Sequence, residues 1–120
     1  MACKVSVRQV GGISVVELSG RITLGDGSGT VRETVRDLIK KEHKNILLNL
    51  GGVNYIDSAG LGELIGSYAS VRNLGGEVKL LNTQKKVHDL LQITKLYTVF
   101  EVFTDEATAL ESFPRKAAIA

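Results

Sequence analysis

The chain has 120 residues, of which 43% are apolar and 23% charged, and its formal net charge is +2. This length suits one domain with a single core, and the composition is typical of globular rather than disordered proteins. The lysines and arginines are scattered, which argues against dedicated nucleic-acid binding, because that function needs clustered phosphate contacts. The single cysteine, Cys3, excludes an internal disulfide and a cysteine-based metal site, and it suits a reducing compartment.

Targeting and metal-binding patterns are missing from the sequence. No segment approaches the ~20 apolar residues that cross a bilayer, and no apolar run near the N-terminus resembles a secretory signal. No grouping of Asp, Glu and His has the spacing of metal ligands. We therefore expect a cytoplasmic protein without membrane insertion, cofactor or metal.

The first two elements are predicted to form a β-hairpin. Residues 4–10 and 13–19 alternate apolar and polar side chains, and a Gly-Gly pair separates them. Two glycines supply the positive φ angles that a tight hairpin turn requires. The adjacent Val15 and Val16 break the alternation, which predicts either a bulge or a strand buried on both faces.

A glycine-rich loop from Gly20 to Gly29 precedes the first predicted helix. Thr30 and Glu33 have the spacing of a capping box, in which each side chain satisfies a backbone N–H at the helix start. The inward face of this helix is expected to carry Val31, Val35, Leu38 and Ile39.

The middle of the chain predicts a buried strand followed by a helix. The apolar run at 45–50 is typical of a strand covered on both faces. The helix is expected from Ser58 to about Arg72, where Asn73-Leu74-Gly75-Gly76 stops it and glycine can supply a left-handed C-cap. Its amphipathic pattern is carried by Leu61, Leu64, Ile65 and Tyr68.

The last third predicts two more strands and two more helices. Residues 77–81 form the fourth strand, and Asn82 or Thr83 is expected to cap a short third helix. That helix carries Val87, Leu90 and Leu91. Residues 97–103 are rich in β-branched and aromatic side chains and predict a fifth strand.

Thr104 is expected to cap the last helix, which should end before Pro114. The whole order is β-β-α-β-α-β-α-β-α. Repeated strand–helix–strand crossovers predict parallel neighbours, and the hairpin adds an antiparallel pair. We therefore predict a single α/β domain over residues 4–113, with a mixed sheet of about five strands and about four helices, and a loose tail at 114–120.

The junction between the buried strand and the second helix is the strongest candidate site. Asp57 and Ser58 lie where a helix N-terminus presents unsatisfied N–H groups and partial positive charge. One interpretation is that one of the two residues only caps the helix. A functional interpretation gains weight from Gly60 and Gly62, because each glycine in a helix costs about 1 kcal/mol relative to alanine.

Glycines there allow another backbone or a ligand to approach closely. Ile56 and Ala59 flank the serine, and we expect them to lie at the surface of this tight junction. An accessible hydroxyl beside an apolar surface suits docking of another protein better than it suits chemistry.

A serine hydrolase is a weaker alternative. Its nucleophile elbow would place glycine two residues before Ser58, where this chain has Ile56. A nucleophilic serine also needs a histidine base, and His43 and His88 both fall in charged segments typical of solvated residues.

A phosphate- or nucleotide-binding protein using residues 25–29 is the other enzyme-like alternative. This loop precedes a helix, where anions bind favourably. It lacks the Gly-Lys-Ser/Thr ending of a P-loop and follows a hairpin. A flexible turn before the helix is the simpler interpretation, although the loop could also help to form a docking face.

The chain resembles a known family over most of its length, from Val5 to about Phe113. The segments that carry the resemblance are Glu17-Leu18-Ser19-Gly20-Arg21, Asn49-Leu50, Ile56-Asp57-Ser58-Ala59-Gly60-Leu61-Gly62 and Gly75-Gly76 before Val78-Lys79-Leu80. They are similar to the anti-sigma factor antagonists, the stand-alone STAS domains. Residues 22–30 depart from the family pattern, which commonly continues with an acidic residue and an Ala-Pro-like helix start.

The resemblance implies a binding protein rather than an enzyme. Its partner is an anti-sigma factor with a kinase-type ATPase domain, which the unphosphorylated antagonist binds, so that the sigma factor is released. Phosphorylation of Ser58 ends the binding, and a phosphatase restores it. The expected partner-binding residues are Ile56, Asp57, Ser58, Ala59, Gly60, Leu61 and Gly62, with Gly25, Asp26 and Gly27 from the neighbouring loop. The same family also implies an alternative, a scaffold or subunit of a larger assembly of the stressosome or lipid-transport type.

Overall fold

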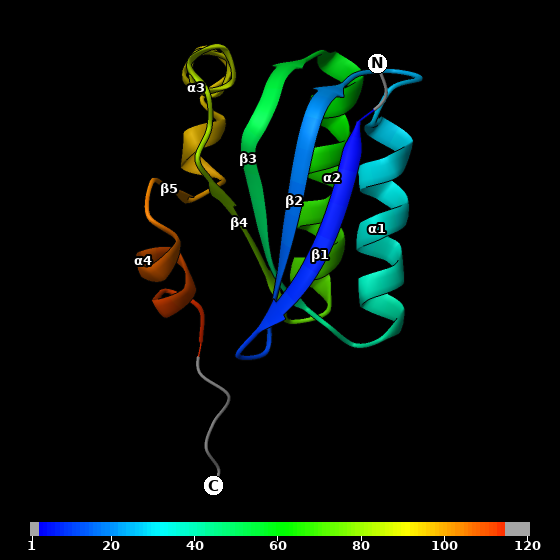
Figure 1. Cartoon of the computed structure of the whole chain (residues 1–120), viewed down its shortest axis with the longest axis vertical. Helices are drawn as coiled ribbons and strands as arrows, with labels where there is room; N and C mark the ends of the chain where they lie inside the picture. Colours follow the sequence, from blue (N-terminus) through cyan, green and yellow to red (C-terminus); the bar gives the residue numbers. More distant parts are fainter. Residues whose placement is uncertain (1–2, 115–120) are drawn as a thin grey trace, which may run out of the picture.

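A five-stranded mixed sheet organises the computed structural model, which describes residues 3–114 (Figure 1). The strands lie side by side in chain order. They are β1 (Lys4–Val10), β2 (Ile13–Ile22), β3 (Asn45–Ile56), β4 (Glu77–Leu81) and β5 (Val102–Phe103). β1 and β2 are antiparallel, and the later pairs are parallel. The predicted element order and mixed α/β fold are confirmed.

The hairpin forms as predicted. Gly11 and Gly12 have φ angles of 56° and 86°, the two positive values that a two-residue turn of type I′ requires. Val15 and Val16 are both buried, so β2 is covered on both faces at this point. The shifts in register with β3 come later, between Glu17 and Ser19 and between Gly20 and Arg21.

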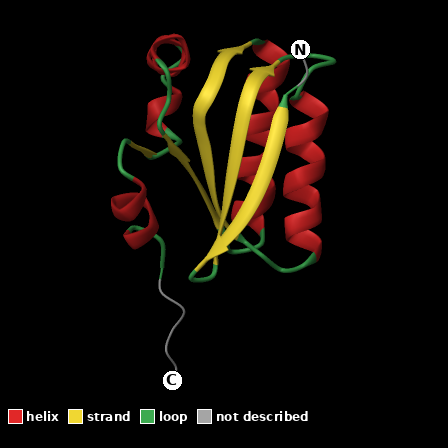
Figure 2. Ribbon diagram, in the orientation of Figure 1, coloured by secondary structure: helices red, strands yellow, loops and turns green. Residues whose placement is uncertain are grey.

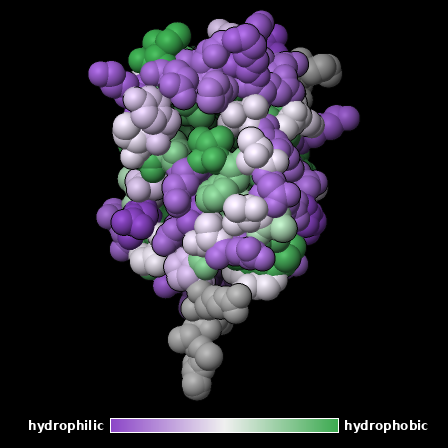
Figure 3. Space-filling view, turned by 90° about the vertical axis from the view of Figure 1, so that its left-hand side faces the viewer, coloured by the Kyte–Doolittle hydropathy of each residue, from purple (hydrophilic) through white to green (hydrophobic). Residues whose placement is uncertain are grey.

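Helices cover the two faces of the sheet unequally. α1 (Ser28–Lys40) and α2 (Ser58–Asn73) run side by side along one face (Figure 2). Their buried side chains share the main core with those of α3 (Lys85–Ile93). A smaller core on the opposite face joins α4 (Glu106–Glu111) to the sheet. Its buried residues are Ile13, Val15, Leu47, Leu81, Ala109 and Phe113. The side of the molecule that carries α3 and α4 is largely hydrophilic, with a small hydrophobic area between hydrophilic residues (Figure 3).

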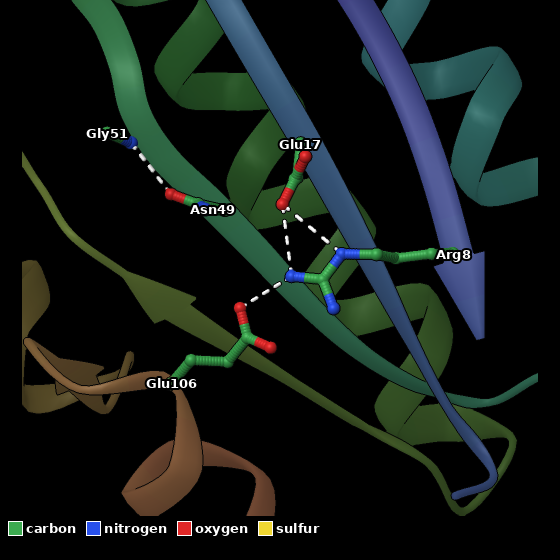
Figure 4. Close-up of polar contacts among 5 residues, drawn as sticks. All are labelled: Arg8, Glu17, Asn49, Gly51 and Glu106. Atoms are coloured by element: carbon green, nitrogen blue, oxygen red, sulfur yellow. Dashed lines mark hydrogen bonds and ion pairs between the residues drawn. The ribbon is translucent and has the colours of Figure 1, made fainter. Parts of the chain in front are cut away.

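Polar contacts fix α4 to the sheet. Arg8 on β1 reaches over β2, where its guanidinium contacts the carboxylates of Glu17 and Glu106 (Figure 4). Lys79 on β4 is buried beneath the helix, and its Nζ lies 3.0 Å from both the carbonyl oxygen and the Oγ of Ser112. The same Nζ lies 2.8 Å from a carboxylate oxygen of Glu101. A cation at the end of a helix satisfies its last carbonyl groups.

Three predicted boundaries in the first half of the chain are wrong. β2 continues to Ile22, three residues beyond its predicted end at residue 19. β3 continues six residues beyond the predicted end at residue 50 and stops at Ile56. α1 begins at Ser28, and Gly27 occupies its N-cap without a side-chain hydrogen bond. The predicted capping box of Thr30 and Glu33 therefore does not form, because the helix has already started when the chain reaches Thr30.

Predictions in the second half fail at three helix or strand ends. Residues 97–103 contain a short 3-10 helix, η1 (Leu96–Thr98), and only Val102–Phe103 pair with β4. Gln84, not Asn82 or Thr83, precedes α3 and makes no side-chain cap bond. Asp105, not Thr104, caps α4 by accepting a hydrogen bond from the N–H of Thr108.

Some of the other predictions for these elements are confirmed, and one is wrong. α2 begins at Ser58, and Gly75 adopts the left-handed conformation after its end. Of the four residues expected to form its apolar face, Ile65 is exposed. α4 ends before Pro114, and residues 115–120 of the predicted tail lie outside the described residues. No helix within residues 3–114 is long and apolar enough to cross a membrane.

Candidate functional site

Asp57 occupies the N-cap of α2, directly after β3. Its backbone is extended, with φ −97° and ψ −174°, and its Oδ1 accepts a hydrogen bond from the N–H of Gly60 at 2.8 Å. The interpretation that one of the two junction residues caps the helix is therefore correct for Asp57. Because Asp57 performs this task, Ser58 is left free for another.

The second oxygen of Asp57 holds the loop that precedes α1. Its Oδ2 accepts a hydrogen bond from the N–H of Leu24 at 3.1 Å. The N–H groups of Gly60 and Leu24 lower the pKa of Asp57 from its ordinary value, since both stabilise the charged carboxylate. The loop and the start of α2 therefore form one connected surface.

Ser58 is the first residue of α2 and is exposed. Among the described residues, no side chain or backbone group is hydrogen-bonded to its hydroxyl. The helix that follows has 16 residues, so its N-terminus contributes partial positive charge at this position. A modifying enzyme can reach this hydroxyl from solvent, and an added anion would meet the favourable end of the helix.

Gly60 is buried against the neighbouring strand rather than open to a partner. A Cβ at this position would collide with the carbonyl oxygen and carbonyl carbon of Ile22 on β2. Ile22 also accepts a hydrogen bond from the N–H of Asp57 at 3.3 Å. The close approach predicted for this glycine is real, but the approaching backbone belongs to the same chain.

Gly62 differs from Gly60. It is exposed, and a Cβ built there would have no atom within 4 Å. Nothing within the described fold therefore requires a glycine at this position, although glycine in a helix costs about 1 kcal/mol relative to alanine. The remaining physical effect of Gly62 is that no side chain projects from the helix surface just beyond Ser58.

The loop before α1 is a closed turn. The N–H of Thr23 donates to the carbonyl of Asp26 at 2.7 Å, and the N–H of Asp26 donates back at 2.9 Å. The N–H of Leu24 donates to Asp57, and the N–H of Ser28 donates to the carbonyl of Thr23 at 3.3 Å. These hydrogen bonds hold the turn against the start of α2.

Gly27 has a structural role in this turn. Its φ is +101°, and a Cβ there would collide with the carbonyl oxygen of Arg21. The turn is therefore packed against the end of β2, and its position relative to Ser58 is fixed.

Leu24 is the surface residue that sequence reasoning missed. Its side chain is 80% exposed at the tip of the turn, beside the Asp57 carboxylate that binds its N–H. The sequence signal for this exposed residue is a large apolar side chain with turn-forming residues on both sides. Tyr55 is also exposed, and the guanidinium of Arg21 lies 5.6 Å from its ring centroid.

The residues expected to bind a partner differ in how exposed they are. Ser58, Gly62 and Gly25 are exposed, and Asp57, Ala59, Leu61 and Asp26 are half-buried. Ile56, Gly60 and Gly27 are buried. The expectation that Ile56 lies at the surface is wrong, since its side chain is only 5% exposed and packs in the main core.

Neither histidine provides a base for Ser58. His43 follows α1, and its Nδ1 lies 3.3 Å from Nε2 of Gln9. His88 lies on α3 and is exposed. In residues 3–114 no hydrogen bond joins either ring to Ser58, so the geometry offers no nucleophile–base pair.

Comparison with known proteins gives a consistent match. A sequence model of the STAS domain family matches residues 4–109. The anti-sigma F factor antagonist of Paenibacillus polymyxa is 30% identical over 100 residues, which are 82% of this chain and 85% of that protein. A crystal structure of an anti-sigma factor antagonist from Mycobacterium paratuberculosis has a TM-score of 0.83 at 18% identity, covering 93% of this chain and 94% of the other. The Bacillus cell fate determinant SpoIIAA in its phosphorylated form has a TM-score of 0.70 at 18% identity, covering 90% and 98%.

Proposed function

Because this chain belongs to the STAS domain family, we propose that it is an anti-sigma factor antagonist whose binding is controlled by phosphorylation of Ser58. In its unphosphorylated form it binds an anti-sigma factor with a kinase-type ATPase domain, so that a sigma factor is freed for transcription. The anti-sigma factor phosphorylates Ser58 and is then released, and a phosphatase restores binding. In this proposal the chain acts in the cytoplasm as a binding protein without a reaction of its own and without direct contact to nucleic acid.

One observation carries this proposal: the Ser58 hydroxyl is exposed at the start of α2 while Asp57 takes over the capping of that helix. A serine that capped the helix would be tied to the backbone, and its modification would break the cap. Here the cap and the modifiable hydroxyl are on separate residues. Phosphate can therefore be added without removing a contact that the fold uses.

The proposed docking surface consists of Leu24, Gly25, Ser58 and Gly62, with Asp57 between the loop and the helix. It combines one exposed apolar side chain with two positions that have no side chain. Such a surface suits a protein partner, because an exposed leucine gains stability only when another surface covers it.

A phosphate on Ser58 acts on this surface through charge. It adds about −1.5 to −2 charges at neutral pH beside the Asp57 carboxylate. A docked partner would have to strip water from these two anions, or it would be repelled by them. A loss of ~3–4 kcal/mol of binding free energy lowers affinity by several hundredfold, which is enough for a switch.

Relatives support the proposal from two directions. The Paenibacillus polymyxa protein of 30% identity is named an anti-sigma F factor antagonist. A structural relative, SpoIIAA, has been solved in a phosphorylated form. Both findings concern the relatives themselves, and the following experiments test the same properties in this chain.

The test of the modification is incubation with the cognate kinase-type anti-sigma factor and ATP, followed by mass spectrometry. We expect one phosphate on Ser58 in the wild-type chain and none in Ser58→Ala. Ser70→Ala is the matched control, because Ser70 is an exposed serine on the same helix, and it should be modified normally. Phosphate on another residue contradicts the proposal.

The test of the charge mechanism is calorimetry with the same anti-sigma factor. Ser58→Asp should weaken binding strongly, whereas Ser58→Ala should bind with the wild-type affinity and resist release by ATP. Equal affinities for the two variants would refute control by charge at this residue.

A further inference from the structure

The outer edge of the sheet is formed by β1, and this edge is open. In the part of the chain that the structure describes, no strand pairs with β1 on the side away from β2 (Figure 1). β1 has seven residues without proline, and all of them pair with β2 in unbroken register. Natural edge strands are usually protected by a proline, a bulge, short length or charged side chains, because an open edge invites another strand. Of these devices, β1 carries only the charged side chains of Lys4 and Arg8.

The hairpin turn determines which backbone groups of β1 face outward. In a two-residue turn the flanking residues, Val10 and Ile13, form a hydrogen-bonded pair. Hydrogen-bonded and non-bonded pairs then alternate along an antiparallel ladder. The N–H and C=O groups of Val5, Val7 and Gln9 are therefore directed away from β2, toward solvent.

The side chains of two of these residues, Val7 and Gln9, line a groove between β1 and α1. Val5 and Val7 are 38% and 43% exposed on an otherwise well-buried face of the sheet. The groove has a volume of about 410 Å³, and Val7 and the buried Leu38 line it together with polar residues of α1. The apolar face of the sheet is therefore partly exposed to solvent at β1.

We propose that β1 pairs antiparallel with β1 of a second copy of this chain, with Val7 on the twofold axis. In this register Val7 faces Val7 of the second copy, and Val5 faces Gln9 of the second copy. These are the three residues whose backbone groups point outward, so each outward group meets a partner. The second Val7 side chain is added beside the first, over the groove next to Leu38.

The charges of β1 agree with this register. Lys4 faces Val10 of the second copy, and Arg8 faces Ser6, so no two cations are directly opposed. A shift of the pairing by two residues would place Lys4 opposite Arg8, and like charges directly opposite each other are destabilising. Arg8 is also held by Glu17 and Glu106, which keeps its charge over its own sheet.

This dimer does not depend on the proposed function. Ser58 follows β3, which is two strands away from β1 in the sheet. Neighbouring strands are about 4.8 Å apart, so the serine lies on the order of 10 Å from the paired edge. Failure of Ser58 phosphorylation and failure of dimerisation would therefore be separate results.

Sedimentation velocity of the purified chain over a range of concentrations tests the association. We expect a monomer–dimer equilibrium, and Val7→Lys should weaken it on the order of tenfold or more, because two cations then meet on the axis. Val99→Lys is the matched control, since Val99 is 36% exposed on a different part of the molecule, and it should leave the equilibrium unchanged. Circular dichroism establishes that both variants are folded. A wild-type chain that stays monomeric throughout, or a dimer that Val7→Lys does not affect, overturns the proposal.

Disulfide trapping tests the register independently, in a Cys3→Ser background. Opposed residues of a hydrogen-bonded antiparallel pair have Cα atoms about 5.5 Å apart, within the range that a disulfide can span. Val7→Cys should cross-link with itself. Val5→Cys should cross-link only when mixed with Gln9→Cys. Self-cross-linking of Val5→Cys alone, or absence of the mixed product, overturns the proposed register.

Discussion

The carboxylate of Asp57 joins Leu24 to the first turn of α2, with one oxygen 3.1 Å from the N–H of Leu24 and the other 2.8 Å from the N–H of Gly60. A single side chain thus determines both the start of the helix and the position of the exposed leucine beside it. Removing this carboxylate should loosen two segments that are 33 residues apart.

Asp57→Ala should accelerate amide hydrogen exchange at Leu24 and Gly60 together, because both N–H groups lose their acceptor. Nuclear magnetic resonance of the two amides measures this directly. Asp105→Ala is the matched control: Asp105 caps α4 in the same way by accepting from Thr108, and its loss should leave Leu24 and Gly60 protected. Independent behaviour of the two amides in Asp57→Ala would contradict the link.

The stabilisation by Asp57 should depend on pH in the direction set by its lowered pKa. The folded chain holds the carboxylate charged, so its contribution is complete above the ordinary value of 3.8 and is lost as the pH falls through the lower folded value. Denaturant titrations should therefore show a stability difference between wild type and Asp57→Ala at neutral pH that shrinks in strong acid. A difference that grows on acidification would show the opposite sign.

Leu24→Ser should weaken binding of the anti-sigma factor about tenfold or more without changing the stability of the free chain. Full burial of a leucine side chain contributes about 1.5–3 kcal/mol, whereas Leu24 contributes little while exposed. Ile93→Ser is the matched control, because Ile93 is also 80% exposed but lies at the end of α3. Calorimetry that finds equal losses for the two variants would place the contact elsewhere.

Gly60→Ala and Gly62→Ala should change stability in opposite directions. The new methyl group at residue 60 would press against the Ile22 carbonyl, and overpacking of this kind costs about 1–3 kcal/mol. At residue 62 the methyl group meets nothing within 4 Å, so the better helix propensity of alanine should add up to about 1 kcal/mol. Urea denaturation of the two variants provides the comparison, and equal signs would contradict the described packing.

Lys79→Met should lower the free energy of unfolding by about 1–3 kcal/mol, because the carbonyl and hydroxyl of Ser112 lose a charged donor. Lys85→Met is the control, since the Lys85 side chain is 87% exposed and forms an exposed ion pair with Asp89. An exposed pair of this kind contributes at most about 1 kcal/mol. If thermal melts find the two variants equally stable, the buried lysine does not hold α4.

The sequence predicts the parts of this fold that depend on local chemistry. The hairpin follows from two glycines with positive φ, and the core of β3 follows from a near-continuous apolar run. The start of α2 is also predictable, because Asp and Ser are strong N-cap residues and either choice gives nearly the same boundary.

Features that depend on contacts between distant segments could not be predicted in this way. Residues 97–100 have strand-forming side chains, but Leu96–Thr98 form a short 3-10 helix and only Val102 and Phe103 pair with β4, so most of the predicted strand does not form. Gly60 looks like an opening for a partner until the position of Ile22 is known. The position of Leu24 likewise depends on the hydrogen bond that its N–H donates to Asp57, 33 residues away.

The contact between Gly60 and the Ile22 carbonyl bears on how a signal can leave this molecule. It leaves α2 no room to move closer to β2 at Gly60, so the N-terminal turn of α2, where Ser58 lies, is held against the sheet. Under the proposed function, a phosphate on Ser58 therefore acts through the charge that it adds at this position. A protein that distinguishes the two forms in this way would have to contact the beginning of α2.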